Sequence, residues 1–257
     1  MRRQIDIFLT ALMFFTRIPV PKRISHDAQL LQKSACYFPW VGWIVGLIAA
    51  GIYIACRRIF PVHISVLISM LASVFTTGAF HEDGFADVCD AFGGGWTKEK
   101  ILLIMKDSRL GTYGVIGLFF MLGMKFLLMY QLLSLLNYRL TIWTIICAHS
   151  LSRLAAVTII QQYKYVTDDT TSKSKPLANR KLIFSEFAFA TIGGLLPFLF
   201  LPNLFLFSII LVVAGRLYLG YYFNKWIGGY TGDCLGATQQ VCEVLFYLAI
   251  IVLWKFT

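Results

Sequence analysis

The sequence predicts an all-α, polytopic integral membrane protein. Of the 257 residues, 58% are apolar and only 14% are charged, whereas soluble domains carry about 25% charged residues. The mean hydropathy is +0.71, and apolar runs long enough to cross a bilayer as helices recur along the whole chain. No stretch between these runs has the composition of a separate soluble domain, so we expect residues 1–257 to form a single membrane-embedded domain.

The apolar runs give the order of the expected elements. A helix needs about 20 predominantly apolar residues to span the hydrocarbon core, and about seven segments approach this length. They are residues 35–56, 62–80, 110–135, 140–162, 182–200, 204–223 and 240–256. Residues 5–18 are apolar but short, which predicts an N-terminal helix in the membrane interface. Pro202 and Asn203 predict a tight turn between two spans.

The basic residues predict the orientation of these spans. The formal net charge of +10 is dispersed between apolar segments, which favours anionic lipid over nucleic acid as a partner. The N-terminal segment and the loops at 81–109, 163–181 and 224–239 hold 16 of the 23 Lys and Arg residues, and the opposite loops hold 4. By the positive-inside rule, the first set faces the cytoplasm, together with the N-terminus.

An acidic stretch, FHEDGFADVCDAFGGG at 80–95, follows the second predicted span. On a helix that turns about 100° per residue, Asp83, Asp87 and Asp90 fall within about 60° of one face. Glu82 points about 100° away from Asp83. Like charges on one face repel, and burial raises that cost. Hard carboxylate oxygens suit Mg²⁺ or Mn²⁺, so we expect the three aspartates as ligands with Glu82 as an outer candidate. A solvated polar cap at a helix end is the alternative.

Residues after the aspartates predict contacts with a phosphate. Gly93 and Gly94 would let the backbone approach a ligand. In MKDSRLGTYG at 105–114, Lys106 and Arg109 are spaced to reach phosphate oxygens. Asp107 has three open roles, which are a fourth metal ligand, a base and the partner of Arg109. The alternative for the two cations is a basic loop that anchors the chain to the membrane.

A second polar stretch, GGYTGDCLGA at 228–237, lies between the last two predicted spans. Its four glycines predict irregular backbone, which membranes tolerate where it lines a cavity. Asp233 is expected to add to the metal site or to orient the nucleophile. Glu243 lies inside the last predicted span, where a carboxylate is costly unless it is paired or functional. A structural ion pair and a functional role both stay open for Glu243.

Two histidines and an arginine complete the candidate site. His81 adjoins the acidic face and is a candidate proton acceptor, with an interfacial side chain as the alternative. His149 lies in an apolar segment as either a core histidine or a base. Arg153 follows His149 by four residues on the same helical face and is a candidate phosphate ligand.

These residue types together predict transfer from a diphosphate at the cytoplasmic membrane surface. A carboxylate-held cation neutralises charge on the bridging and leaving oxygens, and nearby Lys and Arg side chains position the phosphates. Such a reaction needs little covalent help from the protein. An ion transporter is a weaker alternative because the chain has no paired hydrophobic halves.

Two families of membrane transferases match only in part. CDP-alcohol phosphotransferases carry Asp-Gly-x-x-Ala-Arg, which Asp83 to Ala86 begin similarly, but Asp87 replaces the Arg and the second half of that motif is absent. UbiA-type prenyltransferases carry two Asp-x-x-x-Asp motifs. Asp83 and Asp87 match one of them, whereas Asp233 has no acidic partner at that spacing.

The chain resembles the cobalamin synthase family, the adenosylcobinamide-GDP ribazoletransferases, over nearly its whole length. The segments that carry the resemblance are FFTRIPVP at 14–21, YFPWVGWIVG at 37–46, 81–95, 105–114 and 228–237. Ala91 stands where the family usually has Gly, which removes no candidate ligand.

The resemblance implies the reaction and its participants. Adenosylcobinamide-GDP and α-ribazole, or its 5′-phosphate, would give adenosylcobalamin, or its phosphate, and GMP, with Mg²⁺ as cofactor. The chain would be a single transferase domain in the bacterial cytoplasmic membrane, and homo-oligomerisation stays open. The implied metal ligands are Asp83, Asp87 and Asp90, with Glu82 and Asp233 as outer candidates. Lys106 and Arg109 would bind phosphates, and His81 and Asp107 are the candidate proton acceptors.

Overall fold

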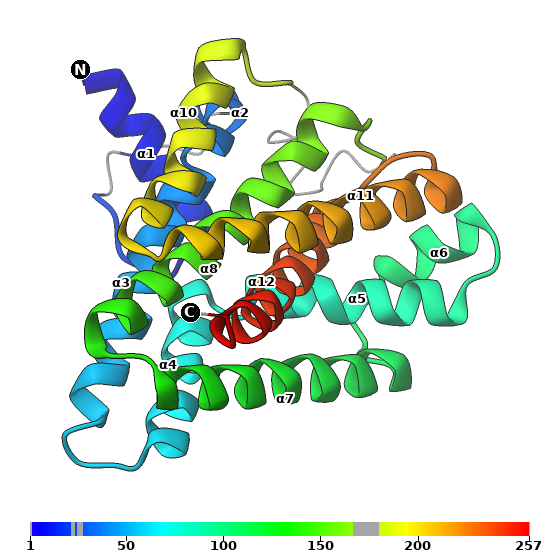
Figure 1. Ribbon diagram of the computed structural model, residues 1–257. Helices are drawn as coiled ribbons and strands as arrows, with labels where there is room; N and C mark the ends of the chain where they lie inside the picture. Colours follow the sequence, from blue (N-terminus) through cyan, green and yellow to red (C-terminus); the bar gives the residue numbers. More distant parts are fainter. Residues whose placement is uncertain (1, 22–23, 25–27, 167–179, 257) are drawn as a thin grey trace.

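The computed structural model describes residues 2–21, 24, 28–166 and 180–256, and this part of the chain is built from helices (Figure 1). Its one isolated bridge joins Tyr165 to Tyr230. The prediction of an all-α fold is confirmed. Lys173 and Lys175 of the basic loop at 163–181 lie outside the described residues.

The described part of the chain holds a series of α-helices. In chain order they are α1 (Arg2–Phe15), α2 (Ala28–Ser34), α3 (Phe38–Cys56), α4 (Val62–Thr77), α5 (Phe80–Gly94), α6 (Lys98–Met105), α7 (Thr112–Leu135), α8 (Tyr138–Gln162), α10 (Phe184–Leu195), α11 (Ser208–Ile227) and α12 (Gly232–Trp254). Three 3-10 helices join them, at Ala35–Tyr37, Leu196–Phe200 and Asn203–Phe207.

Five segments of the described chain are long and apolar enough to cross a membrane. They are Gln29–Cys56, Thr112–Leu135, Tyr138–Gln162, Asn203–Ile227 and Gly232–Trp254, and the bent pair of α4 and α5 would make a sixth. The chain is thus a multi-pass membrane protein, but the expected number of about seven spans is too high. The predicted span at 182–200 is a shorter apolar segment in which α10 ends at Leu195, because Pro197 cannot continue the helical hydrogen bonds.

The predicted span at 62–80 also differs, because it ends in a sharp bend. Helices α4 and α5 meet at 88°, and the two residues between them, Gly78 (φ 66°) and Ala79 (φ 57°), have left-handed backbone. A Cβ atom at Gly78 would collide with the side chain of Arg17, so glycine serves both the turn and the packing. The acidic stretch therefore starts a helix of its own, which runs beside α7 in Figure 1.

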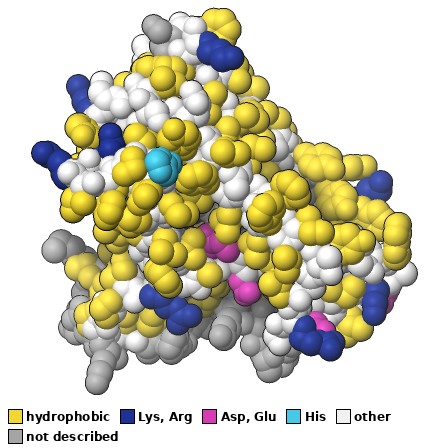
Figure 2. Space-filling model, turned by 90° about the horizontal axis from the view of Figure 1, so that it is seen from below, with side chains coloured by type: hydrophobic (Ala, Val, Ile, Leu, Met, Phe, Trp, Pro, Cys, Tyr) yellow, Lys and Arg dark blue, Asp and Glu magenta, His cyan; other side chains and the backbone are white. Residues whose placement is uncertain are grey.

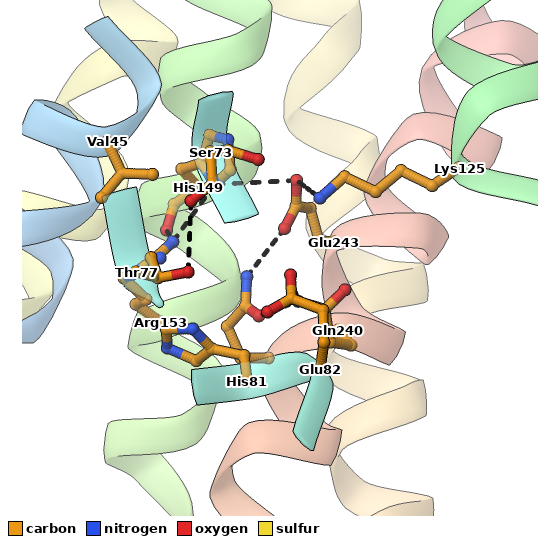
Figure 3. Close-up of a pocket in the computed structure, with 11 residues that line it drawn as sticks. Val45, Ser73, Thr77, His81, Glu82, Lys125, His149, Arg153, Gln240 and Glu243 are labelled. Atoms are coloured by element: carbon orange, nitrogen blue, oxygen red, sulfur yellow. Dashed lines mark hydrogen bonds and ion pairs between the residues drawn. The ribbon is translucent and has the colours of Figure 1, made fainter. Parts of the chain in front are cut away.

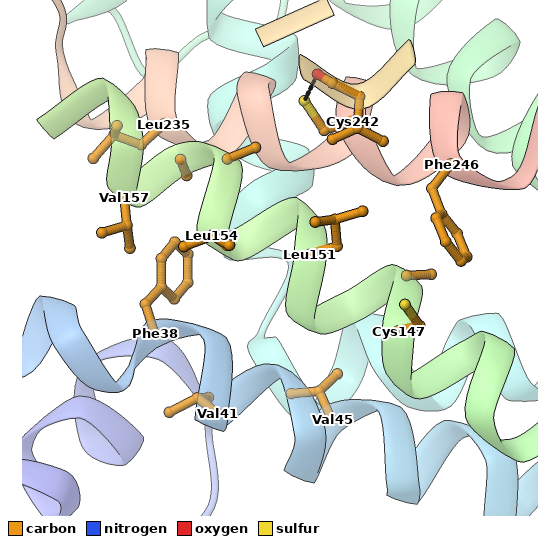
Figure 4. Packing of buried hydrophobic residues seen from close by; sticks show 14 of the residues in the cluster. Phe38, Val41, Val45, Cys147, Leu151, Leu154, Val157, Leu235, Cys242 and Phe246 are labelled. Carbon is orange, nitrogen blue, oxygen red and sulfur yellow. Dashed lines mark hydrogen bonds between the residues drawn. The ribbon is translucent and has the colours of Figure 1, made fainter. Parts of the chain in front are cut away.

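Helix α8 forms the centre of the bundle and is buried along most of its length. Figure 4 shows its apolar side chains between those of α3 and α12. Two glycines of α3 let the backbones approach closely. A Cβ atom at Gly42 would lie 2.5 Å from the carbonyl oxygen of His149, and one at Gly46 would lie 2.8 Å from the Cα of Ile146. Helix α8 thus packs directly against α12, and α5 in turn packs against α12 and α7.

Candidate active site

Helices α5 and α12 cross closely enough to bring the two polar stretches together. A Cβ atom at Gly84 would lie 3.0 Å from the Cα of Asp233, and one at Gly236 would lie 3.1 Å from the carbonyl oxygen of His81. A side chain at either position would fit only if the backbone of the opposite helix moved away. Asp233, at the N-terminal end of α12, therefore lies beside the aspartates of α5.

The aspartates form a group of like charges at least partly open to the surface. Asp83 is exposed, and Asp87, Asp90 and Asp233 are half-buried. The charges of Asp233, Asp83 and Asp90 all repel the carboxylate of Asp87. In the described part of the chain, no Lys, Arg or His forms an ion pair with any of the four. Figure 2 shows Asp or Glu side chains near the middle of one face, with apolar side chains beside them, and others next to Lys and Arg side chains at its edge.

Asp90 differs from the other three because its carboxylate is bonded to the backbone of another helix. Its Oδ2 accepts a hydrogen bond from the amide of Gly111 at 2.7 Å, and its Oδ1 accepts one from the amide of Gly114 at 2.8 Å. Both amides belong to the N-terminal end of α7. The predicted helical face is thus correct for Asp90, but the side chain reaches across to α7.

The loop between α6 and α7 presents its cations to solvent. Lys106 is exposed, and the Arg109 side chain is 88% exposed. Arg109 forms a two-pronged pair with Asp107, in which Nε lies 3.0 Å from both carboxylate oxygens and Nη2 lies 2.6 Å from Oδ2. These bonds from Arg109 hold the pKa of Asp107 below its ordinary value. Of the three roles open for Asp107, the geometry favours the partner of Arg109.

The two candidate glycines have different surroundings. A Cβ atom at Gly93 would lie 2.6 Å from the ring of Tyr113, so this glycine makes room for the start of α7. Gly94 is exposed, and its nearest neighbour would be the Cδ1 of Ile104 at 3.5 Å. Gly94 therefore has the more open backbone for a ligand.

A second cluster of charged groups is buried between α5, α7, α8 and α12 (Figure 3). Glu243 lies at its centre. Lys125 Nζ lies 2.7 Å from Glu243 Oε1, and His149 Nδ1 lies 3.6 Å from the same oxygen. Gln239 Nε2 donates to Glu243 Oε2 at 2.7 Å. Of the two readings of Glu243, the structure shows the ion pair.

Three residues that the sequence analysis assigned to the active site lie in this cluster. Glu82 is buried and accepts a hydrogen bond from Gln240 Nε2 at 2.9 Å. Arg153 donates to the carbonyl oxygen of His149 at 2.9 Å. His81 is 1% exposed, and its ring stacks on Phe38 with centroids 5.7 Å apart. The structure thus separates Glu82, Arg153 and His81 from the aspartate group.

The pocket inside this buried cluster is small. Its volume is about 10 Å³, about the room that one water molecule needs, so no drug-sized ligand fits in it. His149 lines it as a core histidine in contact with Arg153. The aspartate group, which is at least partly open to the surface, is therefore the better candidate for large substrates.

Comparison with known proteins shows the family of this chain. Residues 7–251 match the cobalamin-5-phosphate synthase family. The chain belongs to this family. Relatives named adenosylcobinamide-GDP ribazoletransferase occur in Shewanella putrefaciens and Shewanella baltica, each 45% identical over 251 residues that cover 97% of this chain and 95% of the relative. The relative of that name in Shewanella frigidimarina is 44% identical over 250 residues, with the same coverage. No solved structure matches the chain.

Sequence reasoning missed several polar residues of this chain. Lys125, Gln239 and Gln240 lie within spans and take part in the buried cluster. A signal was present, since a polar side chain inside a span is costly unless it has a partner. The sequence gives no pairing between α7 and α12, however, so the partners could not be named.

The donor set of the aspartate group fits Mg²⁺ by its chemistry. Asp83, Asp87 and Asp233 offer hard carboxylate oxygens and an uncompensated negative charge. Across residues 2–21, 24, 28–166 and 180–256, no group of three or more His, Cys, Asp or Glu side chains is arranged so that it could hold a metal ion. The Mg²⁺ ligands therefore stay a prediction, and their assembly would need side-chain rotation or ligands from a substrate.

Proposed function

We propose that this chain joins adenosylcobinamide-GDP to α-ribazole, or to α-ribazole 5′-phosphate, and releases GMP. Membership of the cobalamin-5-phosphate synthase family supports this reaction, as do the names of the relatives. The structural observation that carries the proposal is the convergence of Asp83 and Asp87 of α5 with Asp233 of α12. Such a group, open to the surface and without cationic partners in the described chain, suits a diphosphate that arrives with a divalent cation.

The bonds that change define what the site must do. A hydroxyl of the ribazole attacks the phosphorus attached to the corrinoid side arm, and the bond from this phosphorus to the bridging oxygen breaks. GMP leaves with that oxygen. Mg²⁺ held by Asp83, Asp87 and Asp233 would supply positive charge to the diphosphate and the leaving group. Positioning the two reactants in line is the other main requirement.

The loop between α6 and α7 supplies the cations for this positioning. Lys106 and Arg109 are exposed and would bind phosphate oxygens. Asp107 holds the guanidinium of Arg109 in one orientation through its hydrogen bonds, which leaves the remaining guanidinium donors for a ligand. The roles of His81 and Asp107 as proton acceptors stay predictions. His81 is enclosed and Asp107 is paired with Arg109, so the geometry favours neither of them as the proton acceptor.

The reaction is proposed for the cytoplasmic face of the bacterial inner membrane. The loops that carry Asp83, Lys106 and Asp233 belong to the set with 16 of the 23 Lys and Arg residues. This distribution supports a cytoplasmic position for these loops and for the N-terminus. Nucleotide substrates and Mg²⁺ would then reach the aspartate group directly from the cytoplasm.

A reconstitution assay tests the proposed function. The purified full chain in lipid nanodiscs is incubated with Mg²⁺, adenosylcobinamide-GDP and α-ribazole, and chromatography measures GMP and the corrinoid product. We expect GMP and a corrinoid with its lower base attached in equal amounts. The Asp87→Asn variant should lose at least about 100-fold in rate, the scale of a lost electrostatic catalytic group.

Two controls make the assay specific. Glu99→Gln removes an exposed carboxylate of α6 outside the aspartate group and should keep the wild-type rate. A CDP-linked donor with a lipid alcohol tests the alternative of a phospholipid-type transferase. Product from that pair, with no GMP from adenosylcobinamide-GDP, would reject the proposed function.

A further inference from the structure

We propose that Asp90 is a positioning residue that fastens the cationic loop at 106–111 to the acidic helix, and that it is not a metal ligand. The inference rests on the proposed function, because that function gives the loop its role in binding phosphate. It separates Asp90 from Asp83 and Asp87, with which it shares a helical face.

The hydrogen bonds of Asp90 form a closed connection between two helices. One carboxylate oxygen accepts from the Gly111 amide at 2.7 Å, and the other accepts from the Gly114 amide at 2.8 Å. Amides at the start of a helix have no partner within that helix. A carboxylate that uses both oxygens there satisfies two of them, and charge-assisted bonds of this type are among the stronger ones in proteins.

The short hydrogen bonds to Asp90 require glycine at both donor positions, 111 and 114. A Cβ atom at Gly111 would collide with Oδ1 of Asp90, and a Cβ atom at Gly114 would collide with Oδ2. The segment Gly-Thr-Tyr-Gly at 111–114 can therefore lie this close to the carboxylate only because its first and last residues have no side chain. The contact can therefore be disrupted by mutation either of Asp90 or of the two glycines.

Electrostatics separates Asp90 from the rest of the aspartate group. The N-terminal end of a long helix carries a partial positive charge, and α7 has 24 residues. Asp90 is therefore compensated inside the protein. Asp83 and Asp233 lie in the first turns of their own helices, α5 and α12, but among the described residues no amide of another helix donates to Asp83, Asp87 or Asp233, and Asp233 accepts a 3.4 Å bond from the Thr231 hydroxyl. These three aspartates remain to attract a cation.

The hydrogen bonds of Asp90 lie next to the loop that carries the candidate phosphate ligands. Lys106, Asp107 and Arg109 lie on the short loop that ends at Gly111. By fixing Gly111 and Gly114 to α5, Asp90 limits how far these cations can move from Asp83 and Asp87. Loss of the connection should therefore weaken binding of the diphosphate donor more than it weakens binding of the metal.

Mn²⁺ binding and donor binding can be measured separately on the full chain in nanodiscs. Electron paramagnetic resonance measures the Mn²⁺ dissociation constant without substrate, and kinetics measure KM for adenosylcobinamide-GDP. Hydrogen exchange measures the amides of Gly111 and Gly114. The variants are Asp90→Ala, Asp90→Asn, Gly111→Ala, Gly114→Ala and Asp87→Asn.

We expect Asp90→Ala and both glycine variants to bind Mn²⁺ within about threefold of wild type, to raise KM about tenfold and to exchange the two amides faster. A tenfold change is the scale of one lost hydrogen bond to a charged group. Asp90→Asn keeps one acceptor oxygen and should give intermediate values. Asp87→Asn should weaken Mn²⁺ binding at least tenfold with unchanged exchange at Gly111 and Gly114.

Equal loss of Mn²⁺ binding in Asp90→Ala and Asp87→Asn would overturn the inference, and so would wild-type exchange at both amides in Asp90→Ala. If a glycine variant does not fold, Asp90→Asn and Asp90→Ala decide the matter alone. If wild type releases no GMP, the proposed function fails. The Mn²⁺ and exchange results still decide whether Asp90 is a positioning residue or a metal ligand.

Discussion

At the scale of the residue, Gly84 determines how closely α5 and α12 approach. It is buried in the middle of the acidic motif, and its neighbour across the crossing is the backbone of Asp233. Backbone cannot move aside as the end of a flexible side chain can. The identity of residue 84 therefore controls the distance between the aspartates of two helices.

We expect Gly84→Ala to displace Asp233 and to lower kcat together with stability. A Cβ atom at this position would lie 3.0 Å from the Cα of Asp233, and overpacking of this kind costs about 1–3 kcal/mol. Melting temperature in detergent and the rate of GMP release measure the two effects. The matched control is Gly51→Ala, since Gly51 of α3 has no neighbour within 4 Å. A Gly84→Ala variant that behaves like this control would contradict the close crossing.

At the scale of the element, a buried ionic cluster joins the helices that carry the site. Glu82 of α5, Lys125 of α7, Arg153 of α8 and Glu243 of α12 are all at least 92% buried, and they provide two negative and two positive charges. A balanced set of this kind is tolerated inside a membrane protein, whereas a single uncompensated charge is costly. The cluster therefore sets which helices can pack together.

Removal of one partner of the central pair should destabilise the bundle. In Lys125→Met, Glu243 loses the ammonium group at 2.7 Å, and a buried pair broken in this way costs about 3–5 kcal/mol. Adding Glu243→Gln should recover a large part of that loss because no uncompensated carboxylate remains. Melting temperatures of the wild type, the two single variants and the double variant form the test. Additive losses would show that the two side chains do not act as a pair.

The elements also show what a sequence can predict of this fold. Long apolar runs predicted α7, α8, α11 and α12 as membrane spans, because hydropathy alone is enough to identify a long apolar helix. The runs at 62–80 and 182–200 met the same criterion but contain a left-handed turn at Gly78 and a proline at 197, which shorten the helices. Periodicity placed three aspartates on one face of α5. It could not foresee that Asp90 bonds to α7 or that Glu82 turns inward to Gln240, because those partners come from other helices.

At the scale of the whole molecule, the distribution of basic residues predicts which side of the membrane holds the aspartate group. The loop at 106–111 lies on the basic side of the chain, and the connection between α3 and α4 lies on the other. Ile59 in that connection is 78% exposed, so both loops offer surface positions for labelling. The two loops should therefore react from opposite sides of a vesicle.

Cysteine labelling tests this orientation. We expect Lys106→Cys to react with an impermeant maleimide only when the cytoplasmic face is outward, and Ile59→Cys only in the opposite orientation. The unmodified chain is the control, because four of its six cysteines are buried and the other two, Cys56 and Cys89, are half-buried. The reverse pattern would place the aspartate group outside the cytoplasm and exclude cytoplasmic nucleotides as direct substrates.

The dependence of GMP release on Mg²⁺ tests most directly whether α5 and α12 hold one divalent cation together. We predict that Asp233→Asn raises the half-saturating Mg²⁺ concentration at least about tenfold, the scale of one lost bond to a charged group. Asp87→Asn should stay at least about 100-fold slower than wild type at every Mg²⁺ concentration. Wild-type Mg²⁺ dependence in both variants would show that the cation is held elsewhere, and the account of the site would be wrong.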